Sequence, residues 1–320
     1  MAKILAEELT ALGHRVTVVT MERDVDNTQF EFKIVRRPSP LGLVRLARLA
    51  NVVLQMNLSL KGLWLFLFVR RPLIVSHQGP YRRRSGHMGL RDRLKYRAAR
   101  LVTNISCSSG IRGDLPANTI VVWNAYDDKV FRHWSVDRNK DLVFVGRLVS
   151  DKGLDLLLNS LVVLREKRVK PSLTIVGLGP EEYSLRRFCH EMQMQDQVTF
   201  AGQRTGSELA ALINQHRIMV VPSRSEGFGI VALEGIACGC IVVGSDTGGL
   251  PEAIGNCGII FRSGDVVDLS KVLMQVLADK AVEERILAAR EHHLARFTRR
   301  EVARQYLEVI ENTLAHSGSR

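Results

Sequence analysis

Residues 220–252 read VVPSRSEGFGIVALEGIACGCIVVGSDTGGLPE, and this stretch decides the fold. An apolar strand ends at Val221, a polar loop with two glycines follows, and a helical run begins near Ile230. A second β-branched run at residues 241–243 then starts another strand. Two strands joined by a helix form the βαβ unit of a parallel sheet, so the stretch predicts an α/β fold.

Short β-branched runs alternate with helical segments in both directions from this stretch, which predicts two doubly wound domains with parallel sheets. Residues 127–140 are polar and lack apolar periodicity, so we place the junction there, between domains at residues 1–135 and 136–320. In the tail, Val302 and Tyr306 recur at helical spacing and predict a C-terminal helix. Strands are expected at residues 15–19, 31–35, 52–56, 72–76, 102–107 and 119–123, and then at 142–146, 172–176, 198–200, 218–221, 241–243 and 258–261.

The printed sequence begins inside an expected helix over residues 2–12, which Gly13 ends. A doubly wound sheet normally opens with a strand and a glycine-rich turn before its first helix. We therefore expect this sequence to be truncated at its N-terminus, without that first strand and loop.

The composition is that of a globular protein. Of the 320 residues, 46% are hydrophobic and 24% are charged, which excludes disordered and fibrous classes. The longest apolar stretch, residues 62–69, is too short to span a membrane. Residues 1–12 carry Glu7 and Glu8 and lack the continuous apolar core of a signal peptide, so we expect a cytoplasmic location.

The cysteines predict reduced packing residues and no disulfide framework. No Cys-x-x-Cys pair and no zinc-like spacing with histidine is present. A metal or redox site at Cys238 and Cys240 is the alternative, although both lie in an apolar run. The five cysteines are Cys107, Cys189, Cys238, Cys240 and Cys257.

The net charge of +12 is concentrated in one half of the chain. Residues 1–140 hold 24 basic and 11 acidic residues, whereas the remainder holds 21 and 22. A basic half suggests an anionic partner such as a phospholipid headgroup, a lipid-linked phosphate or nucleic acid, and a solvated basic face is the alternative. The basic residues that we expect to face a membrane surface or a lipid-phosphate acceptor are Arg82, Arg83, Arg84, Arg91, Arg93, Lys95, Arg97 and Arg100.

The loop before Ile230 has the features of a sugar and phosphate site. Gly227 and Gly229 allow a ligand to approach the backbone, and the unpaired N–H groups of the first helical turn attract phosphate. Glu226 and Glu234, eight residues apart, offer carboxylates for sugar hydroxyls. The alternative is a solvated pair of glutamates, but the neighbours of Glu234 are apolar.

Two further turns have the composition of a diphosphate and nucleoside site. The strand at residues 142–146 leads into a turn with Arg147 and Lys152, cations suited to a diphosphate, unless they pair with nearby acids. Gly177 and Gly179 follow the next strand and would pass closely under a base or ribose, although such a turn is common in α/β folds.

Together these segments resemble the retaining glycosyltransferases of family four, which belong to glycosyl transferases group 1 and have the GT-B fold. The resemblance is carried by the Glu226 to Glu234 spacing, by Gly146-Arg147-Leu148 with Lys152-Gly153, and by residues 248–252, GGLPE. It covers nearly the whole chain. It implies two Rossmann-like domains that face a central cleft, with the C-terminal helix returning to the first domain.

The resemblance also implies a role for each residue. Arg147 and Lys152 would hold the donor diphosphate, Glu226 would bind hydroxyls of the transferred sugar, and Glu234 would bind the ribose. His77, at the end of a first-domain strand, would face the sugar from across the cleft. The remaining donor-site positions are Gly146, Gly177, Gly179, Gly227, Phe228 and Gly229.

The implied activity is retaining transfer of a hexose-type sugar from a UDP- or GDP-linked donor to a glycan or lipid-linked acceptor, in cell-surface polysaccharide or glycolipid synthesis. No metal, no cofactor and no nucleic-acid partner is expected, because fixed cations and a helix terminus stabilise the leaving diphosphate. Peripheral attachment at the inner face of the plasma membrane is a further expectation. The alternatives are a nucleotide-sugar-binding remnant without activity and a GT-B-type epimerase. A Rossmann dehydrogenase is disfavoured, because the Gly177 turn lies in the middle of its domain.

Overall fold

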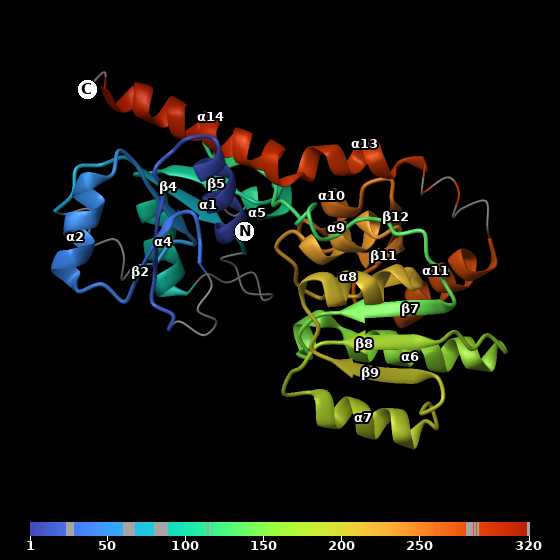
Figure 1. Ribbon diagram of the computed structural model, residues 1–320. Helices are drawn as coiled ribbons and strands as arrows, with labels where there is room; N and C mark the ends of the chain where they lie inside the picture. Colours follow the sequence, from blue (N-terminus) through green and yellow to red (C-terminus); the bar gives the residue numbers. More distant parts are fainter. Residues whose placement is uncertain are drawn as a thin grey trace. The chain divides into compact units, whose positions relative to one another are not determined.

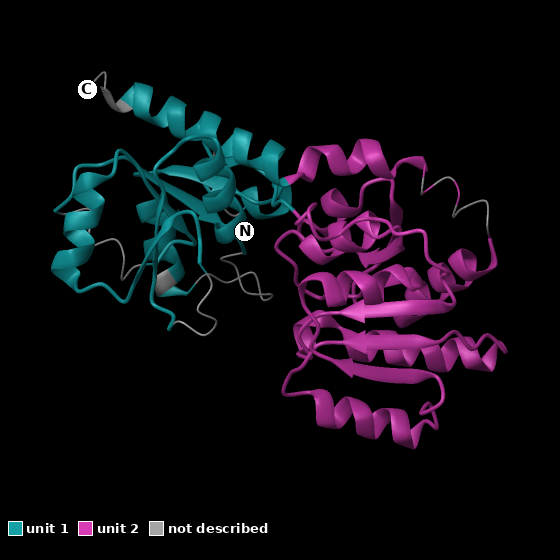
Figure 2. Ribbon diagram, in the orientation of Figure 1, with its two compact units in different colours: residues 1–125, 299–320 teal, residues 126–298 magenta. Residues whose placement is uncertain are grey.

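The computed structural model describes residues 1–23, 29–59, 68–79, 89–113, 115–116, 118–279, 284, 286 and 288–318. The chain forms two compact units, shown in teal and magenta in Figure 2. Unit 1 comprises residues 1–125 and 299–320, and unit 2 comprises residues 126–298.

Unit 2 is built on a six-stranded parallel sheet in the order β12-β11-β10-β7-β8-β9. β8 and β11 are buried along their whole length, which explains their continuous β-branched runs. The six strands match the second series expected from the sequence. They are β7 Lys140–Val145, β8 Leu173–Val176, β9 Val198–Gly202, β10 His216–Val221, β11 Ile241–Ser245 and β12 Gly258–Phe261.

Helices cover this sheet between its strands (Figure 1). α11 (Val266–Ala278) begins where the Asp265 carboxylate accepts the N–H of Asp268, and it packs against α6 (Leu154–Glu166). The other helical segments of unit 2 are η2 Ser150–Lys152, α7 Glu182–Glu191, α8 Gly206–Asn214, α9 Ile230–Ala237, α10 Leu250–Ile254, α13 Arg290–Leu294 and η3 Ala295–Phe297.

The strand order of unit 2 reverses between β7 and β10. These two strands are neighbours in the sheet, with Ile218 paired to Leu142, although they are the first and fourth strands of the unit along the chain. The loops that follow their carboxyl ends leave toward opposite faces, and ligands of open α/β sheets bind at such a reversal. This point of the sheet positions the candidate site.

Unit 1 contains two parallel sheets among its described residues. β1 (Thr17–Thr20) pairs with β2 (Lys33–Arg36), and a separate four-stranded sheet has the order β3-β4-β5-β6. The six strands match the first expected series. Those of the larger sheet are β3 Val53–Met56, β4 Leu73–His77, β5 Thr103–Ser106 and β6 Ile120–Val121.

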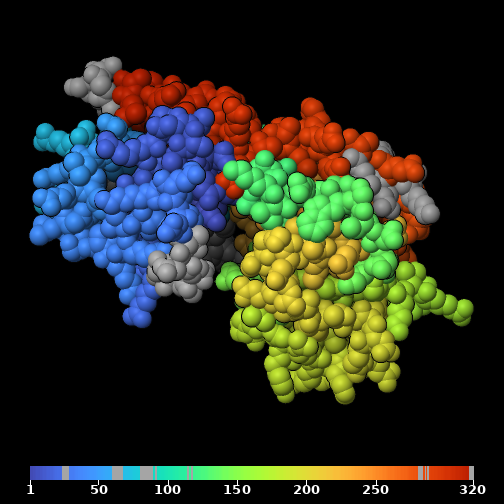
Figure 3. Space-filling view, in the orientation of Figure 1, coloured from blue at the N-terminus to red at the C-terminus, as the bar shows by residue number. Residues whose placement is uncertain are grey.

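The core of unit 1 joins the two ends of the chain. α1 (Ala2–Ala11) and α14 (Arg299–Gly318) pack on one face of the larger sheet, where Leu5 and Tyr306 share a cluster with Ile74 of β4. The red residues of α14 lie against blue residues from the start of the chain (Figure 3). Unit 1 also contains α2 Pro40–Leu49, α4 Leu90–Ala99 and α5 Ser109–Arg112.

The units differ from the expected domains in two respects. The boundary lies between Ala125 and Tyr126, ahead of the expected one after residue 135. Residues 299–320, assigned by position to the second domain, belong to unit 1, because the apolar face of α14 completes the core of that unit. This confirms the expected return of the C-terminal helix to the first domain.

Candidate functional site

The carboxyl ends of β7 and β10 bring two of the expected site residues into direct contact. Lys152 lies in η2 after β7, and Glu226 lies in the loop after β10. The Lys152 Nζ is 2.6 Å from the Glu226 Oε2, and the buried Ser223 hydroxyl donates to the same oxygen at 3.1 Å. The two charged side chains are 25% and 15% exposed, so a ligand can still reach the pair.

The loop that carries Glu226 is fastened to the turn after β7 by Arg224. Its guanidinium donates to both carboxylate oxygens of Asp155, at 2.6 and 2.5 Å, and to the Ser150 carbonyl at 2.7 Å. Its backbone N–H donates to the Asp151 carbonyl at 2.8 Å. The hydrogen bond to Asp155 raises the pKa of Arg224, so this fork stays charged.

Glycines allow the loops at this edge to approach one another closely. A Cβ on Gly179 would lie 2.2 Å from the Leu148 carbonyl oxygen, and a Cβ on Gly177 would lie 1.9 Å from that of Gly146. A Cβ on Gly248 would lie 1.7 Å from the carbonyl oxygen of Glu226. At these three positions the structure shows glycine required by protein backbone, whereas the sequence had suggested only ligand approach at Gly177 and Gly179.

The first turn of α9 supplies hydrogen-bond donors beside Glu226. Gly229 caps this helix with a left-handed φ of 98°, which favours glycine. The N–H groups of Phe228 and Gly229 donate to no other described residue. The Phe228 ring is buried and contacts the ring of Phe297, and this packing holds the turn in place. Donors held this way at a helix N-terminus bind anions.

Glu234 lies one turn further along α9 and is half-buried. Burial, and to a smaller extent the nearby Asp127 carboxylate, raise the pKa of its carboxyl to about 7. Arg147, in contrast, is exposed directly after β7, and no other described residue pairs with it. Among the described residues of this edge, Arg147 is therefore an unpaired cation and Lys152 a paired one, and the Glu226 and Glu234 carboxyl groups differ in their surroundings.

His77 ends β4 in unit 1, where it is fully buried. The Asn104 amide donates to the carbonyls of Ala99 and Val102, so its oxygen faces His77 and accepts from the His77 Nε2 at 2.9 Å. Burial lowers the pKa of His77, against the hydrogen bond to Asn104, so the imidazole is neutral at pH 7.

A polar network lies beside His77 at the carboxyl edge of the same sheet. The Ser76 hydroxyl lies 2.6 Å from that of Tyr306, and Gln78 donates to Ser76 and accepts from Asn124 at 2.7 Å. The Asn124 Oδ1 is buried and has no hydrogen-bond partner among the described residues. This edge is therefore suited to ligands that carry hydroxyl groups.

The structure brings most of the predicted donor-site residues together in unit 2, whereas His77 belongs to unit 1. Gly177 lies against the Gly146 carbonyl and Gly179 against the Leu148 carbonyl. Three further predicted positions directly follow Glu226 in its loop: Gly227, Phe228 and Gly229. The sequence did not reveal Arg224 and Asp155. The sequence shows an arginine two residues before Glu226, but it does not indicate the partner of this arginine, because Asp155 lies 69 positions away.

The described residues contain no group of three or more His, Cys, Asp or Glu side chains placed to hold a metal ion. All five cysteines are free and buried, and burial raises the pKa of Cys189 and of Cys257 to about 11. Among the helices that the structure describes, none combines the length and apolar character needed to cross a membrane.

Comparison with known sequences gives a family match. The family model described as "Glycosyl transferases group 1" matches residues 127–292. The D-inositol 3-phosphate glycosyltransferase of Stackebrandtia nassauensis is 32% identical over 223 residues, 62% of this chain and 50% of that protein. A glycogen synthase of Mycobacterium tuberculosis is 35% identical over 147 residues, 45% of this chain and 36% of that protein. The chain thus spans half or less of the length of these relatives.

Solved structures share the fold over almost the whole chain. A sucrose-phosphate synthase from Thermosynechococcus elongatus superposes with a TM-score of 0.83 at 20% identity, covering 98% of this chain and 92% of that one. HepE from Anabaena, in complex with UDP and glucose, gives a TM-score of 0.81 at 20% identity, with 97% and 95% covered. These matches confirm the α/β GT-B fold expected from the sequence.

Proposed function

The chain belongs to the glycosyl transferases group 1 family, and from this premise we propose that it is a retaining glycosyltransferase that uses a nucleoside diphosphate sugar. The observation that carries the proposal is the Lys152–Glu226 pair at the strand-order reversal, beside the N–H groups of Phe228 and Gly229 at the start of α9, for which the described residues offer no acceptor. Cations and helix donors suit the diphosphate, and the carboxylates suit sugar hydroxyls. UDP is the favoured nucleotide, since HepE binds UDP and glucose on the same fold.

We assign the donor diphosphate to Arg147, Lys152 and the N–H groups of Phe228 and Gly229. Lys152 would exchange its bond with Glu226 for one with phosphate oxygens, and the exposed Arg147 would fold over the same anion. As the bond from sugar to phosphate breaks, negative charge grows on the leaving diphosphate, and these fixed donors stabilise it. The chemistry thus needs no step through a metal ion.

Glu226 and Glu234 would hold the sugar and the ribose at the two ends of the diphosphate. Once Lys152 moves to phosphate, the Glu226 carboxylate is free to accept sugar hydroxyls, while the Ser223 hydroxyl keeps it oriented. The acceptor attacks the face from which the diphosphate leaves, which gives retention. The acceptor that we propose is a glycan or a lipid-linked hydroxyl compound, consistent with the polar edge at Gln78 and Asn124.

The test is binding and turnover of radiolabelled UDP-sugars by the full chain. We expect Glu226→Ala and Arg147→Ala to lower turnover at least about a hundredfold, because each removes a group that contacts the reacting donor. Glu208→Ala and Arg187→Ala, exposed charges on α8 and α7, serve as controls and should change turnover less than twofold. Unchanged turnover in folded Glu226→Ala and Arg147→Ala would refute the proposal.

A further inference from the structure

Two helices of unit 1, α2 and α4, cover the same face of the four-stranded sheet. Leu73 and Val75 of β4 pack against Ala99 of α4, and Val53 of β3 packs against that cluster and also against Ala47 of α2. Ile74, between them in β4, points to the other face, which α1 and α14 cover. The outer sides of α2 and α4 therefore form one side of unit 1.

This side exposes an unusual number of leucines. Side chains this large and apolar rarely remain in water on several neighbouring turns without a binding partner. Leu90 and Leu94 of α4 and Leu101, just after its end, recur at intervals of four and seven residues, so the three lie on the same side of the helix. The exposed fractions are 83% for Leu41, 78% for Leu49, 76% for Leu90, 46% for Leu94 and 87% for Leu101.

Arginines flank these leucines, and almost no acid accompanies them. Residues 40–49 and 90–101 contain seven Lys and Arg and a single acid, Asp92, which pairs with Lys95 at 3.8 Å. Arg97 lies between Leu94 and Leu101 on the same side, and in α2 Arg45 and Arg48 follow Leu41 at helical spacing. The exposed arginines are Arg45, Arg48, Arg93, Arg97 and Arg100. Arg82, Arg83 and Arg84 lie outside the described residues, and so does the side chain of Arg91.

We propose that this leucine–arginine surface, the outer sides of α2 and α4, binds the surface of an anionic lipid bilayer. The leucines would enter the headgroup region, while the arginines would pair with lipid phosphates. Nucleic acid would be attracted by the same charge but offers nothing for five exposed leucines to bind. This inference concerns lipid alone and stands whether or not the chain transfers sugar.

The test is flotation of the full chain with vesicles, without any sugar donor. We expect binding to vesicles of equal parts phosphatidylglycerol and phosphatidylcholine, and little binding to phosphatidylcholine alone. Arg93→Gln with Arg97→Gln should weaken partitioning about 25-fold, at about fivefold for each arginine near an anionic surface. Leu90→Ser with Leu94→Ser and Leu101→Ser should weaken it at least about tenfold, because the apolar contribution is lost.

A matched control lies on unit 2. Tyr183→Ser with Arg187→Gln removes an exposed aromatic residue and an arginine from α7, where Arg187 already pairs with Glu191, and should leave partitioning unchanged. Circular dichroism confirms that each variant is folded. Equal binding by the leucine variant, or tighter binding of a short duplex RNA than of the anionic vesicles, would overturn the proposal. Loss of binding in the α7 control would do the same.

Discussion

Lys152 and Glu226 bind each other at the point where each is expected to bind the donor. The free chain must therefore break a 2.6 Å ion pair before a diphosphate can take Lys152. For Glu226→Gln we expect UDP to bind about two- to fivefold more tightly, since a partly exposed pair contributes about 0.5–1 kcal/mol, while sugar transfer falls sharply. Calorimetric titration with UDP measures the affinity.

Glu208→Gln provides the comparison for this experiment. Glu208 is an exposed acid on α8 of the same unit, so its loss changes the net charge equally without freeing Lys152. Weaker UDP binding by Glu226→Gln than by the wild type would show that Lys152 does not take the diphosphate.

Glu234 couples the stability of the fold to pH. Its pKa is about 7 in the folded chain and near 4.5 when exposed, so between these values the folded chain keeps a proton that the unfolded chain has lost. The free energy of unfolding contributed by this group therefore falls as pH rises through this window. Glu234→Gln should exceed the wild type in stability at pH 8, by at least about 1 kcal/mol, and should match it below pH 4.5. Urea unfolding at both pH values measures the difference in stability between Glu234→Gln and the wild type. The same difference at the two pH values would contradict this prediction.

At this scale the sequence indicated candidate site residues, but it did not indicate which side chains they contact. Glu226, Lys152 and Arg147 follow from the residue types at the ends of strands, and the alternative that a cation pairs with a nearby acid holds for Lys152. The Arg224–Asp155 fork could not be predicted, because it joins loops 69 positions apart. Nor could the contact of Gly179 with the Leu148 carbonyl, which depends on the register of β7 and β8.

At the scale of elements, the loops after β7, β8, β10 and β11 interlock through glycine. Gly248 precedes α10 with a φ of 56°, and its Cα faces the Glu226 carbonyl oxygen so closely that a Cβ would lie 1.7 Å away. Gly248→Ala must move the peptide of Glu226, so we expect a loss of about 2 kcal/mol or more in unfolding free energy, together with loss of donor binding. Thermal unfolding and UDP titration measure the two effects.

Gly146→Ala is the matched change in this experiment. Gly146 lies at the same edge, but its φ is not left-handed. A Cβ there would make ordinary contacts with the Phe144 ring at 3.4 Å and with the Lys152 Cγ at 3.8 Å. The free energy of unfolding of Gly146→Ala should stay within about 1 kcal/mol of that of the wild type. If Gly248→Ala proves equally mild, the loops do not interlock as described.

The twelve strands of the described residues all overlap runs predicted from the sequence. The prediction was simplest for strands such as β8 and β11, which are buried along their whole length and therefore apolar and rich in β-branched residues. The pairing of the strands could not be predicted from the sequence. The separation of β1 and β2 from the sheet of β3 to β6 depends on contacts between segments distant along the chain. For the same reason the apolar face of α14 indicated a helix, but not which domain it completes.

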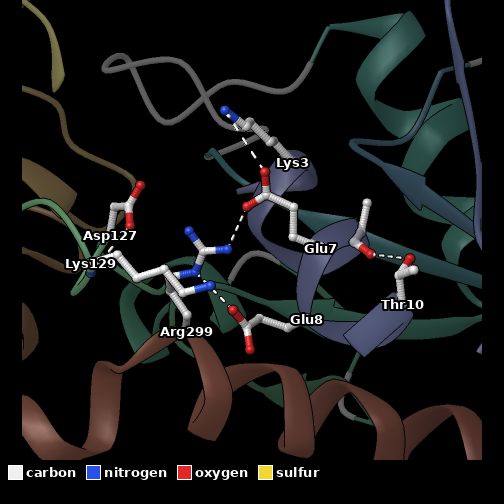
Figure 4. Close-up of polar contacts among 8 residues, drawn as sticks. Lys3, Glu7, Glu8, Thr10, Asp127, Lys129 and Arg299 are labelled. Carbon is white, nitrogen blue, oxygen red and sulfur yellow. Dashed lines mark hydrogen bonds and ion pairs between the residues drawn. The ribbon is translucent and has the colours of Figure 1, made fainter. Parts of the chain in front are cut away.

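At the scale of the whole molecule, unit 1 is assembled from both ends of the chain, and one buried arginine joins them. Arg299 begins α14 and is 6% exposed in its side chain. It donates to Glu8 at 2.9 Å through Nε and to Glu7 through a terminal nitrogen, as Figure 4 shows. Both glutamates lie in α1, so their bonds with Arg299 fasten α14 to α1.

Replacing Arg299 should therefore destabilise unit 1 selectively. Arg299→Met removes the buried cation that bridges Glu7 and Glu8, although Glu7 keeps its pair with the exposed Lys3 at 3.8 Å, and we expect the free energy of unfolding of unit 1 to fall by about 2–3 kcal/mol. Arg304→Met is the matched control, since Arg304 pairs with Glu301 in the same helix but is 62% exposed, and its loss should cost less than about 1 kcal/mol. Hydrogen exchange resolves the units: peptides from α1 and α14 should exchange faster in Arg299→Met, while those from β7 and β10 keep wild-type rates. Equal acceleration in both units would mean that the two units unfold as one cooperative body, and the pair would then stabilise the whole chain.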